Sequence, residues 1–344
     1  LIETREISND PDRKRIKGWA LFTRAYAFYA LVSTFSKAYE ATSAASDLGI
    51  PLKLTAGIDE IAMRSSVKES YDQIIKDVLA SSDLLQQDII PGKRNRPSKV
   101  AAFALLARVY LSMRNYEQAE MYASRSLAIY STLTSFQTLN KTSQIPFTFD
   151  AEEVIYFSRI LNEYNELILA RPTNTYGISP DLINLYDPSD LRLKIYFQKN
   201  TLNNYNIKPI NTANAFPFTG LATDEMYLIK AECLSRRGEK SEAMELLNKL
   251  LKTRWDPDGK AYQDVLASSQ EASLDEILKE RRRALVFRSV RWTDLKRLNL
   301  EGRNIKITRK IEDQIYELMP NSPLYVLPIP EDEITLSGIQ QNLR

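Results

Sequence analysis

The chain has 344 residues, of which 44% are apolar and 26% charged, the balance of a folded globular protein rather than a disordered one. Lysine and arginine number 46 against 44 aspartate and glutamate, and the net charge of +2 argues against a nucleic-acid binder that works by bulk charge. The sequence has no histidine, which excludes imidazole general bases, Ser-His-Asp and Cys-His nucleophiles and histidine-ligated metals. Its one cysteine, Cys233, excludes an intrachain disulfide and a cysteine-rich zinc site.

The ten glycines are spaced too widely for a G-x-G-x-x-G fingerprint, a Walker A loop or a G-x-S-x-G elbow. No apolar run approaches the roughly 18–20 residues that a membrane-spanning helix requires. Most enzyme classes are therefore disfavoured, and binding or scaffolding is the leading class of function.

The N-terminal region predicts two long helices joined by a loop. The first helix covers residues 12–37, and its apolar residues occupy more than one face, which is typical of a buried helix. A loop rich in Ala, Ser, Thr and Gly follows over residues 38–57, and the second helix covers residues 66–87. We expect residues 12–87 to form a degenerate helix pair with a long connection.

Residues 97–130 fit the helix–turn–helix template of a tetratricopeptide repeat, with Asn115 at the turn. Ala107 and Ala119 are the small residues where the two helices must cross closely. The large residues that fill the groove beside them are Phe103, Leu106 and Tyr110.

A second match to the template lies at residues 224–254. Ala231 and Ala243 stand at the crossing and Gly238 at the turn, whereas Lys230 departs from the expected large apolar residue. The alternative interpretation is two unrelated antiparallel helix hairpins.

The segment between these repeats, residues 131–222, is rich in Asn, Pro, Thr and Tyr and has no helical period. Its β-like stretches are residues 153–157 and 194–197. A simple solenoid does not contain such a segment. We therefore expect a loop-rich elaboration laid over a helical scaffold, with many side chains free for contacts with a ligand.

The C-terminal part, residues 274–344, begins with helical patterns over 274–285 and 286–300 and later has a proline-bounded extended segment at 325–330. A basic cluster lies in its helices and comprises Lys279, Arg281, Arg282, Arg283, Arg288 and Arg291. One interpretation is a phosphate or nucleic-acid patch. The other is a packed helix in which Glu280 and Asp294 pair with guanidinium groups, and the low net charge favours this second interpretation. Trp19 and Trp292 are then both expected in the core.

Six groups of residues follow one another along nearly the whole chain. They are Lys17 to Tyr26 with Gly49 to Leu52; Arg64 to Val67 with Tyr71 to Val78; Arg96 to Ala102 with Leu106 to Leu111; Ser179 to Ile183 with Tyr186, Asp190 and Arg192; Glu225 to Glu232 with Asn248 and Arg254; and Ile277, Glu280 to Arg282, Arg291 to Leu295, Pro328 to Pro330 and Gln341-Asn342. In this order the chain resembles the SusD/RagB family of surface glycan- and nutrient-binding lipoproteins of Bacteroidetes.

The resemblance implies a single, mostly α domain over residues 1–344, with tetratricopeptide-like helix pairs as an α-α superhelical scaffold, a loop-rich elaboration and minor β structure. It implies no catalysis and no cofactor. It also implies a lipid-anchored, surface-exposed location on the outer membrane beside a SusC-like TonB-dependent transporter, to which an oligosaccharide, or in some members a peptide, is delivered. We expect the lipid anchor, the one contact with the membrane, to lie outside this numbering, and we expect no nucleic-acid partner.

Three further features can each be interpreted either as a functional site or as a common structural feature. The run from Asp256 to Gly259 is either a calcium loop or, because Lys260 and Ala261 replace residues that such a loop needs, a simple turn. Paired carboxylates such as Glu152 and Glu153 are the minimum for a glycosidase, but acidic residues are common. Cys233 is expected to be a buried, inert thiol, and no metal site is expected.

Sugar binding favours an aromatic face flanked by amide, carboxylate or guanidinium groups. One loop offers Tyr39. A second stretch offers tyrosines and polar partners, namely Tyr164, Asn165, Arg171, Asn174 and Tyr176. We expect Tyr164 and Tyr176 to be stacking platforms, on a surface formed by residues 131–222 with the 37–50 loop beside it and the 280–294 helix away from it. Ordinary surface tyrosines are the alternative.

The leading hypothesis is a non-enzymatic, cell-surface protein that binds oligosaccharide nutrients. A tetratricopeptide adaptor that binds a peptide or protein is the alternative from another class, and a loop-borne glycosidase is the third. The sequence does not name the ligand.

Overall fold

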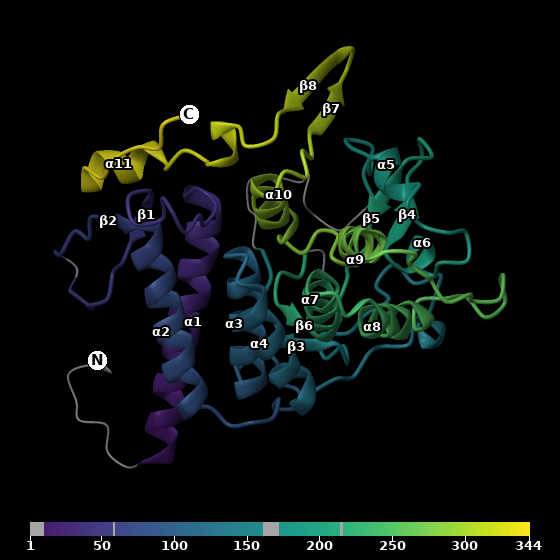
Figure 1. The fold of residues 1–344 in the computed structure, drawn as a ribbon, viewed down its shortest axis with the longest axis horizontal. Helices are drawn as coiled ribbons and strands as arrows, with labels where there is room; N and C mark the ends of the chain where they lie inside the picture. Colours follow the sequence, from purple (N-terminus) through teal and green to yellow (C-terminus); the bar gives the residue numbers. More distant parts are fainter. Residues whose placement is uncertain (1–9, 58, 161–171, 214–215) are drawn as a thin grey trace. The chain divides into compact units, whose positions relative to one another are not determined.

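The computed structural model describes residues 10–57, 59–160, 172–213 and 216–344. The chain is mostly helical, as predicted, and it divides into two compact units (Figure 1). The first unit contains residues 1–85, 108–115 and 290–344, and the second contains residues 86–107 and 116–289. The expectation of one domain over the whole chain stays a prediction.

The first unit is built on two long helices and the C-terminal segment. Its elements are α1 (Pro11–Phe35), β1 (Leu48–Pro51), β2 (Arg64–Ser66), α2 (Val67–Leu84), α10 (Arg291–Leu300), β7 (Ile307–Ile311), β8 (Gln314–Leu318), the 3-10 turn η3 (Pro323–Tyr325) and α11 (Glu331–Ser337). Helix α3 (Lys99–Ser112) has residues in both units.

Helices α1 and α2 pack as the predicted N-terminal pair. Pro11 and the Asp10 side chain begin α1, and a capping box between Ser66 and Glu69 begins α2. Gly18 lets the helices approach closely, because a Cβ atom there would lie 3.0 Å from Leu85. The predicted loop over residues 38–57 is wrong in one detail, since it contains the short strand β1, which pairs antiparallel with β2 directly before α2.

The C-terminal segment is attached to the first unit by side chains from the family-like groups. Arg64 donates to the Gly49 carbonyl at 2.8 Å and to Asn342 Oδ1 at 2.9 Å. Gln341 makes two hydrogen bonds to the backbone of Ile329, at 2.8 and 2.9 Å. Residues 326–330 therefore keep an irregular path, as the prolines predict, and side-chain amides satisfy part of their backbone.

The second unit contains the two predicted repeats and the segment between them. Its elements are α4 (Tyr116–Ile129), the 3-10 turn η1 (Phe136–Thr138), β3 (Val154–Tyr156), α5 (Pro180–Ile183), α6 (Arg192–Ile195), β4 (Phe197–Lys199), β5 (Tyr205–Ile207), β6 (Leu221–Ala222), α7 (Thr223–Arg236), α8 (Lys240–Lys252) and α9 (Gln270–Ala284).

The predicted repeats form helices at the expected places: α7 packs on α8, and α3 meets α4 through the rings of Phe103 and Tyr122, with centroids 5.9 Å apart. The alanines predicted at the crossings, Ala107, Ala119, Ala231 and Ala243, are all fully buried. Helix α4 also packs directly on α7, so the two repeats are neighbours although a long segment separates them in sequence. The elaboration therefore emerges between two stacked repeats, which explains how a repeat scaffold accommodates it.

The elaboration has a hydrophobic core of its own, so the expectation that many of its side chains are free is wrong for this part. The buried residues include Phe136, Phe147, Val154, Tyr186, Leu191, Ile195, Tyr196, Phe197, Ile207 and Phe218. The β-like stretch at 153–157 is confirmed as β3, which pairs with β6. The stretch at 194–197 is wrong, because it contains the end of helix α6 and only the first residue of β4.

Candidate binding site

The predicted ligand residues fall in different parts of the structure. Tyr39 is half-buried in the first unit, and its ring meets the buried ring of Tyr71 edge-on, with centroids 5.2 Å apart. Next to it, Glu40 pairs with Arg114 at 2.6 Å. Tyr39 is thus held by packing, with part of its ring exposed.

Asn174 and Tyr176 lie in the second unit, whereas Tyr164, Asn165 and Arg171 lie outside the described residues. Asn174 is exposed and Tyr176 is half-buried. The assignment of all six side chains to a ligand site stays a prediction.

The segment that contains Asn174 and Tyr176 lies along the β4–β5 hairpin, and asparagine side chains hold it there. The buried Asn206 accepts from the Thr173 N–H at 3.0 Å and donates to the Tyr176 carbonyl at 2.8 Å. Asn200 donates to the Thr173 carbonyl at 2.7 Å. These bonds satisfy part of the backbone of the segment and hold its path along the hairpin.

The resulting surface, which we call the asparagine surface, consists of Thr173, Asn174, Tyr176, Asn200, Thr201, Asn204 and Tyr205. The Asn174 amide donates to the Thr201 hydroxyl at 2.7 Å, and this hydroxyl donates back to the amide oxygen at 3.0 Å. An amide and a hydroxyl paired in this way keep further donor and acceptor positions for a ligand.

Tyr205 adds an aromatic ring that the sequence-based prediction missed. It is half-buried, its ring meets that of Phe197 edge-on, and the Lys199 ammonium lies 5.4 Å from its centroid. Asn200, Thr201 and Tyr205 were missed although the same signal, a high density of Asn and Tyr without helical period, is present at 200–206.

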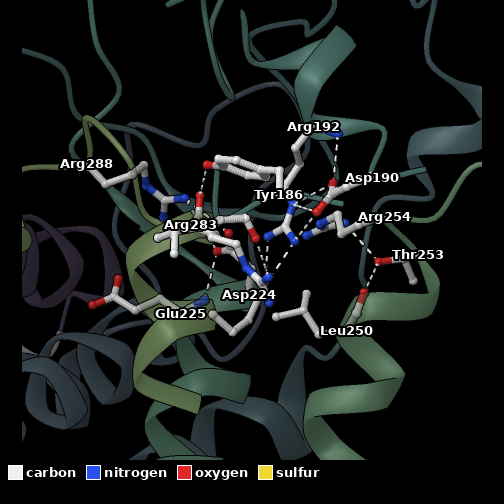
Figure 2. A network of polar contacts seen from close by, with 12 residues as sticks. Tyr186, Asp190, Arg192, Asp224, Glu225, Leu250, Thr253, Arg254, Arg283 and Arg288 are labelled. Atoms are coloured by element: carbon white, nitrogen blue, oxygen red, sulfur yellow. Dashed lines mark hydrogen bonds and ion pairs between the residues drawn. The ribbon is translucent and has the colours of Figure 1, made fainter. Parts of the chain in front are cut away.

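Buried ion pairs fix the elaboration to the helices of the second unit (Figure 2). Arg192 is fully buried, pairs with Asp190 at 2.7 Å and donates to Glu280 on α9. Glu280 also accepts from Arg283 at 2.8 Å, and the Tyr186 hydroxyl donates to the Arg283 carbonyl at 2.8 Å. This part of the elaboration therefore packs on α9, while the expectation that the ligand surface lies away from the 280–294 helix stays a prediction.

Two further arginines make buried pairs in the same unit. Arg254 donates to Glu153 at 2.5 Å, and Arg288 pairs with Asp224 at 3.2 Å. Burial raises the pKa of Glu153 although Arg254 opposes the shift. Burial alone also raises the pKa of Glu280, but Arg192 and Arg283 outweigh it and hold that pKa below its ordinary value.

The interpretation of the basic cluster as a packed helix is confirmed for α9, where Glu280 pairs with Arg283 and Arg281 is buried. The single helix expected over residues 280–294 is wrong, because α9 ends at Ala284 and α10 begins at Arg291. Asp294 pairs at 3.0 Å with Arg297, which lies outside the cluster. Trp19 and Trp292 were both expected in the core. Each is only half-buried, so this expectation is correct only in part.

The aspartate-rich turn and the cysteine have ordinary surroundings. The Asp256 carboxylate accepts from Lys141 at 3.0 Å and from Lys194 at 2.9 Å, and these hydrogen bonds lower its pKa to about 2. Two ammonium groups thus occupy the oxygens that a cation would need. Cys233 is buried, as expected. In the described part of the chain, no group of three or more acidic residues or cysteines is placed so that it could hold a metal ion.

Two family models match the sequence. The one described as "Starch-binding associating with outer membrane" matches residues 1–111, and the one described as "SusD family" matches residues 187–343. The chain belongs to the SusD/RagB family.

Individual SusD relatives match almost the full chain. SusD-like protein P2 of Formosa agariphila is 25% identical to this chain over an alignment 392 residues long. The alignment covers 97% of this chain and 74% of that protein. A SusD superfamily structure from Bacteroides thetaiotaomicron has a TM-score of 0.76 at 25% identity and covers 100% of this chain and 81% of its own. A SusD-like carbohydrate binding protein from Bacteroides vulgatus has a TM-score of 0.71 at 21% identity, with coverages of 98% and 79%.

The SusD family-like groups identified in the sequence have structural roles in this chain. Gly49 lies against Ser66, where a Cβ atom would be 2.3 Å from the Ser66 carbonyl oxygen. Arg192, Glu280 and Arg254 form the buried pairs, and Asn342 binds Arg64. These groups therefore specify the scaffold, and the ligand surface has to be found elsewhere. Within the described residues, no helix is both long and apolar enough to cross a membrane.

Proposed function

We propose that this chain binds oligosaccharide nutrients without catalysis and presents them to a SusC-like TonB-dependent transporter. The observation that carries the proposal is the asparagine surface, in which the Asn174 amide and the Thr201 hydroxyl are paired on segments that also carry the half-buried Tyr176 and Tyr205. Sugar hydroxyls need donors and acceptors in fixed positions, and the apolar face of a pyranose needs an aromatic ring. A relative named for carbohydrate binding and a family model described as starch-binding support this ligand class.

The same proposal includes the location and the partner. We infer a lipid-anchored protein on the outside of the outer membrane, in line with the family description, with its anchor outside this numbering. A gene for a TonB-dependent transporter beside this one is expected. An isolated gene with no such neighbour would contradict the delivery step but not sugar binding.

Binding is tested by calorimetric titration of the protein with a panel of neutral oligosaccharides. Tyr176→Ala removes one predicted platform in the described structure, and Tyr164→Ala removes the other predicted platform. Loss of a stacking ring should weaken binding roughly 5–30-fold, which corresponds to about 1–2 kcal/mol. Tyr316→Ala, an exposed tyrosine on β8, is the matched control and should bind as the parent does.

Circular dichroism checks that each variant is folded. Parent-like affinity in both Tyr164→Ala and Tyr176→Ala would overturn the site. Release of reducing sugar during incubation would overturn the absence of catalysis and support the glycosidase hypothesis instead.

A further inference from the structure

A cavity of about 440 Å³ lies between α4 and the C-terminal end of α7, on the helical scaffold and within the second unit. Tyr116 and Met121 of α4 line one side, and Arg236 and Arg237 line the other. Neither the family-like residue groups nor the predicted ligand residues include these positions. Because α4 and α7 belong to different repeats, the cavity marks the junction of the two repeats.

Part of the cavity is formed by an aromatic ring and the guanidinium group that stacks on it. The Arg236 guanidinium lies 4.1 Å from the centroid of the Tyr116 ring and also donates to the fully buried Glu232 at 3.0 Å. The stacking and the ion pair hold both side chains in one orientation. The thioether of Met121 and the thiol of Cys233 extend this part of the cavity with soft apolar surface.

Both arginines of the cavity are paired with carboxylates. Arg237 donates to both carboxylate oxygens of Glu120, at 2.9 and 3.1 Å, and Arg236 is paired with Glu232. A charged ligand would compete with these pairs, whereas a neutral one would leave them intact. The carboxylate of Glu117 and the hydroxyl of Ser124 also line the cavity and are not engaged by another described side chain.

We propose that this cavity is a second, separate binding site for a neutral sugar residue. Hydroxyl groups both donate and accept, so they match the oxygens of Glu117, Glu120 and Ser124 without altering the charge balance. Met121 and the part of the Tyr116 ring that Arg236 does not cover offer the apolar contact that one face of a pyranose requires. The ligand class rests on the proposed function, but the site is independent of the asparagine surface.

The test follows the Met121 methyl group by NMR after labelling of the methionine methyls. The chain has six methionines, so the spectrum is simple, and Met121→Leu assigns the signal. Titration with maltose, cellobiose and lactose at millimolar concentrations should shift the Met121 signal with at least one sugar. The buried Met244 and the exposed Met319 are internal controls and should not move.

Two variants separate this site from the other surface. Tyr116→Ala should weaken the Met121 response roughly 5–30-fold, whereas Tyr116→Phe, which keeps the ring, should retain it. Tyr176→Ala should leave the response unchanged. Since the ligand is neutral, raising the salt concentration should also have little effect.

If none of the three sugars shifts Met121, the second site does not exist as proposed. Saturation transfer from protein to sugar in the same samples then shows whether the proposed function survives at another surface. A stronger Met121 response to the cationic dipeptide lysyl-lysine than to any sugar, weakened by salt, would also overturn the proposal, because it would make Glu117 the centre of a peptide site.

Discussion

The buried carboxylate of Glu280 gives the sharpest test of how the elaboration is held on the scaffold. Glu280→Gln keeps the shape of the side chain but removes the charge that faces Arg192 and Arg283. Arg192 would keep Asp190, and Arg283 would keep its hydrogen bond to the Leu185 carbonyl at 2.8 Å. Because all of these groups are buried or nearly so, we expect a loss of about 3–5 kcal/mol in the free energy of unfolding.

The matched control is Glu276→Gln on the same helix. Glu276 is 34% exposed and pairs with Lys279 at 3.5 Å, so the same chemical change should cost about 0–1 kcal/mol. Urea unfolding followed by far-UV circular dichroism measures both variants. Equal losses in the two variants would refute the reasoning, since burial would then make no difference to the pair.

The pH dependence of unfolding gives a second test of the buried Glu280 carboxylate. The pKa of Glu280 lies below its ordinary 4.5 in the folded protein, so the unfolded state binds more protons in that range. The stabilisation is therefore complete above pH 4.5 and is lost as the pH falls below it. Glu280→Gln should lack this component and give a flatter profile on the acid side.

Two further predictions concern the repeats and a buried lysine. Ala107→Leu should lose about 1–3 kcal/mol by overpacking the α3–α4 crossing, whereas Ala128→Leu on the exposed face of α4 should change stability little, as measured by urea unfolding. Lys296 is buried, donates to the carbonyls of Ser33 and Ser36 at 3.0 and 2.5 Å, and has its pKa lowered from 10.5 to about 8 by burial. Above pH 8 the folded state releases this proton while the unfolded state keeps it until pH 10.5, so stability should rise with pH across that window by up to about 3 kcal/mol. Lys296→Met should lose this slope, and an unchanged slope in thermal unfolding between pH 7 and 10 would contradict the assignment.

The helix pairs could be predicted from the sequence because their signals are local. Apolar periodicity and small residues at fixed spacing, such as Ala107 and Ala119, report directly on a close helix crossing. The pairing of Glu280 with Arg283 is local as well, since the two residues lie one helical turn apart.

The core of the elaboration could not be predicted in this way. Arg192 and Glu280 are 88 residues apart in sequence, and no local pattern joins them. The apolar residues around Tyr196 and Phe197 have neither a helical nor a strand period, and short apolar runs do not distinguish a strand from a helical turn. For the same reason, the stretch at 194–197 was assigned to a strand although it ends α6.

The position of the elaboration between stacked repeats explains how the sequence of the proposed ligand surface can change while the helical scaffold stays the same. Strands β3 and β6 pair at its base, and the N–H of Thr223, the first residue of α7, donates to the Glu153 carbonyl at 2.9 Å. Arg254, two residues after α8, meets the Glu153 side chain and donates to the Thr134 carbonyl at 2.7 Å, so both ends of the elaboration are fixed to the second repeat. Extending a closed loop costs little additional entropy, about 0.6 kcal/mol for each doubling of its length. Changes beyond this base, for example around Asn174 and Thr201, can therefore alter the proposed ligand surface without disturbing the crossings that stabilise the helix pairs.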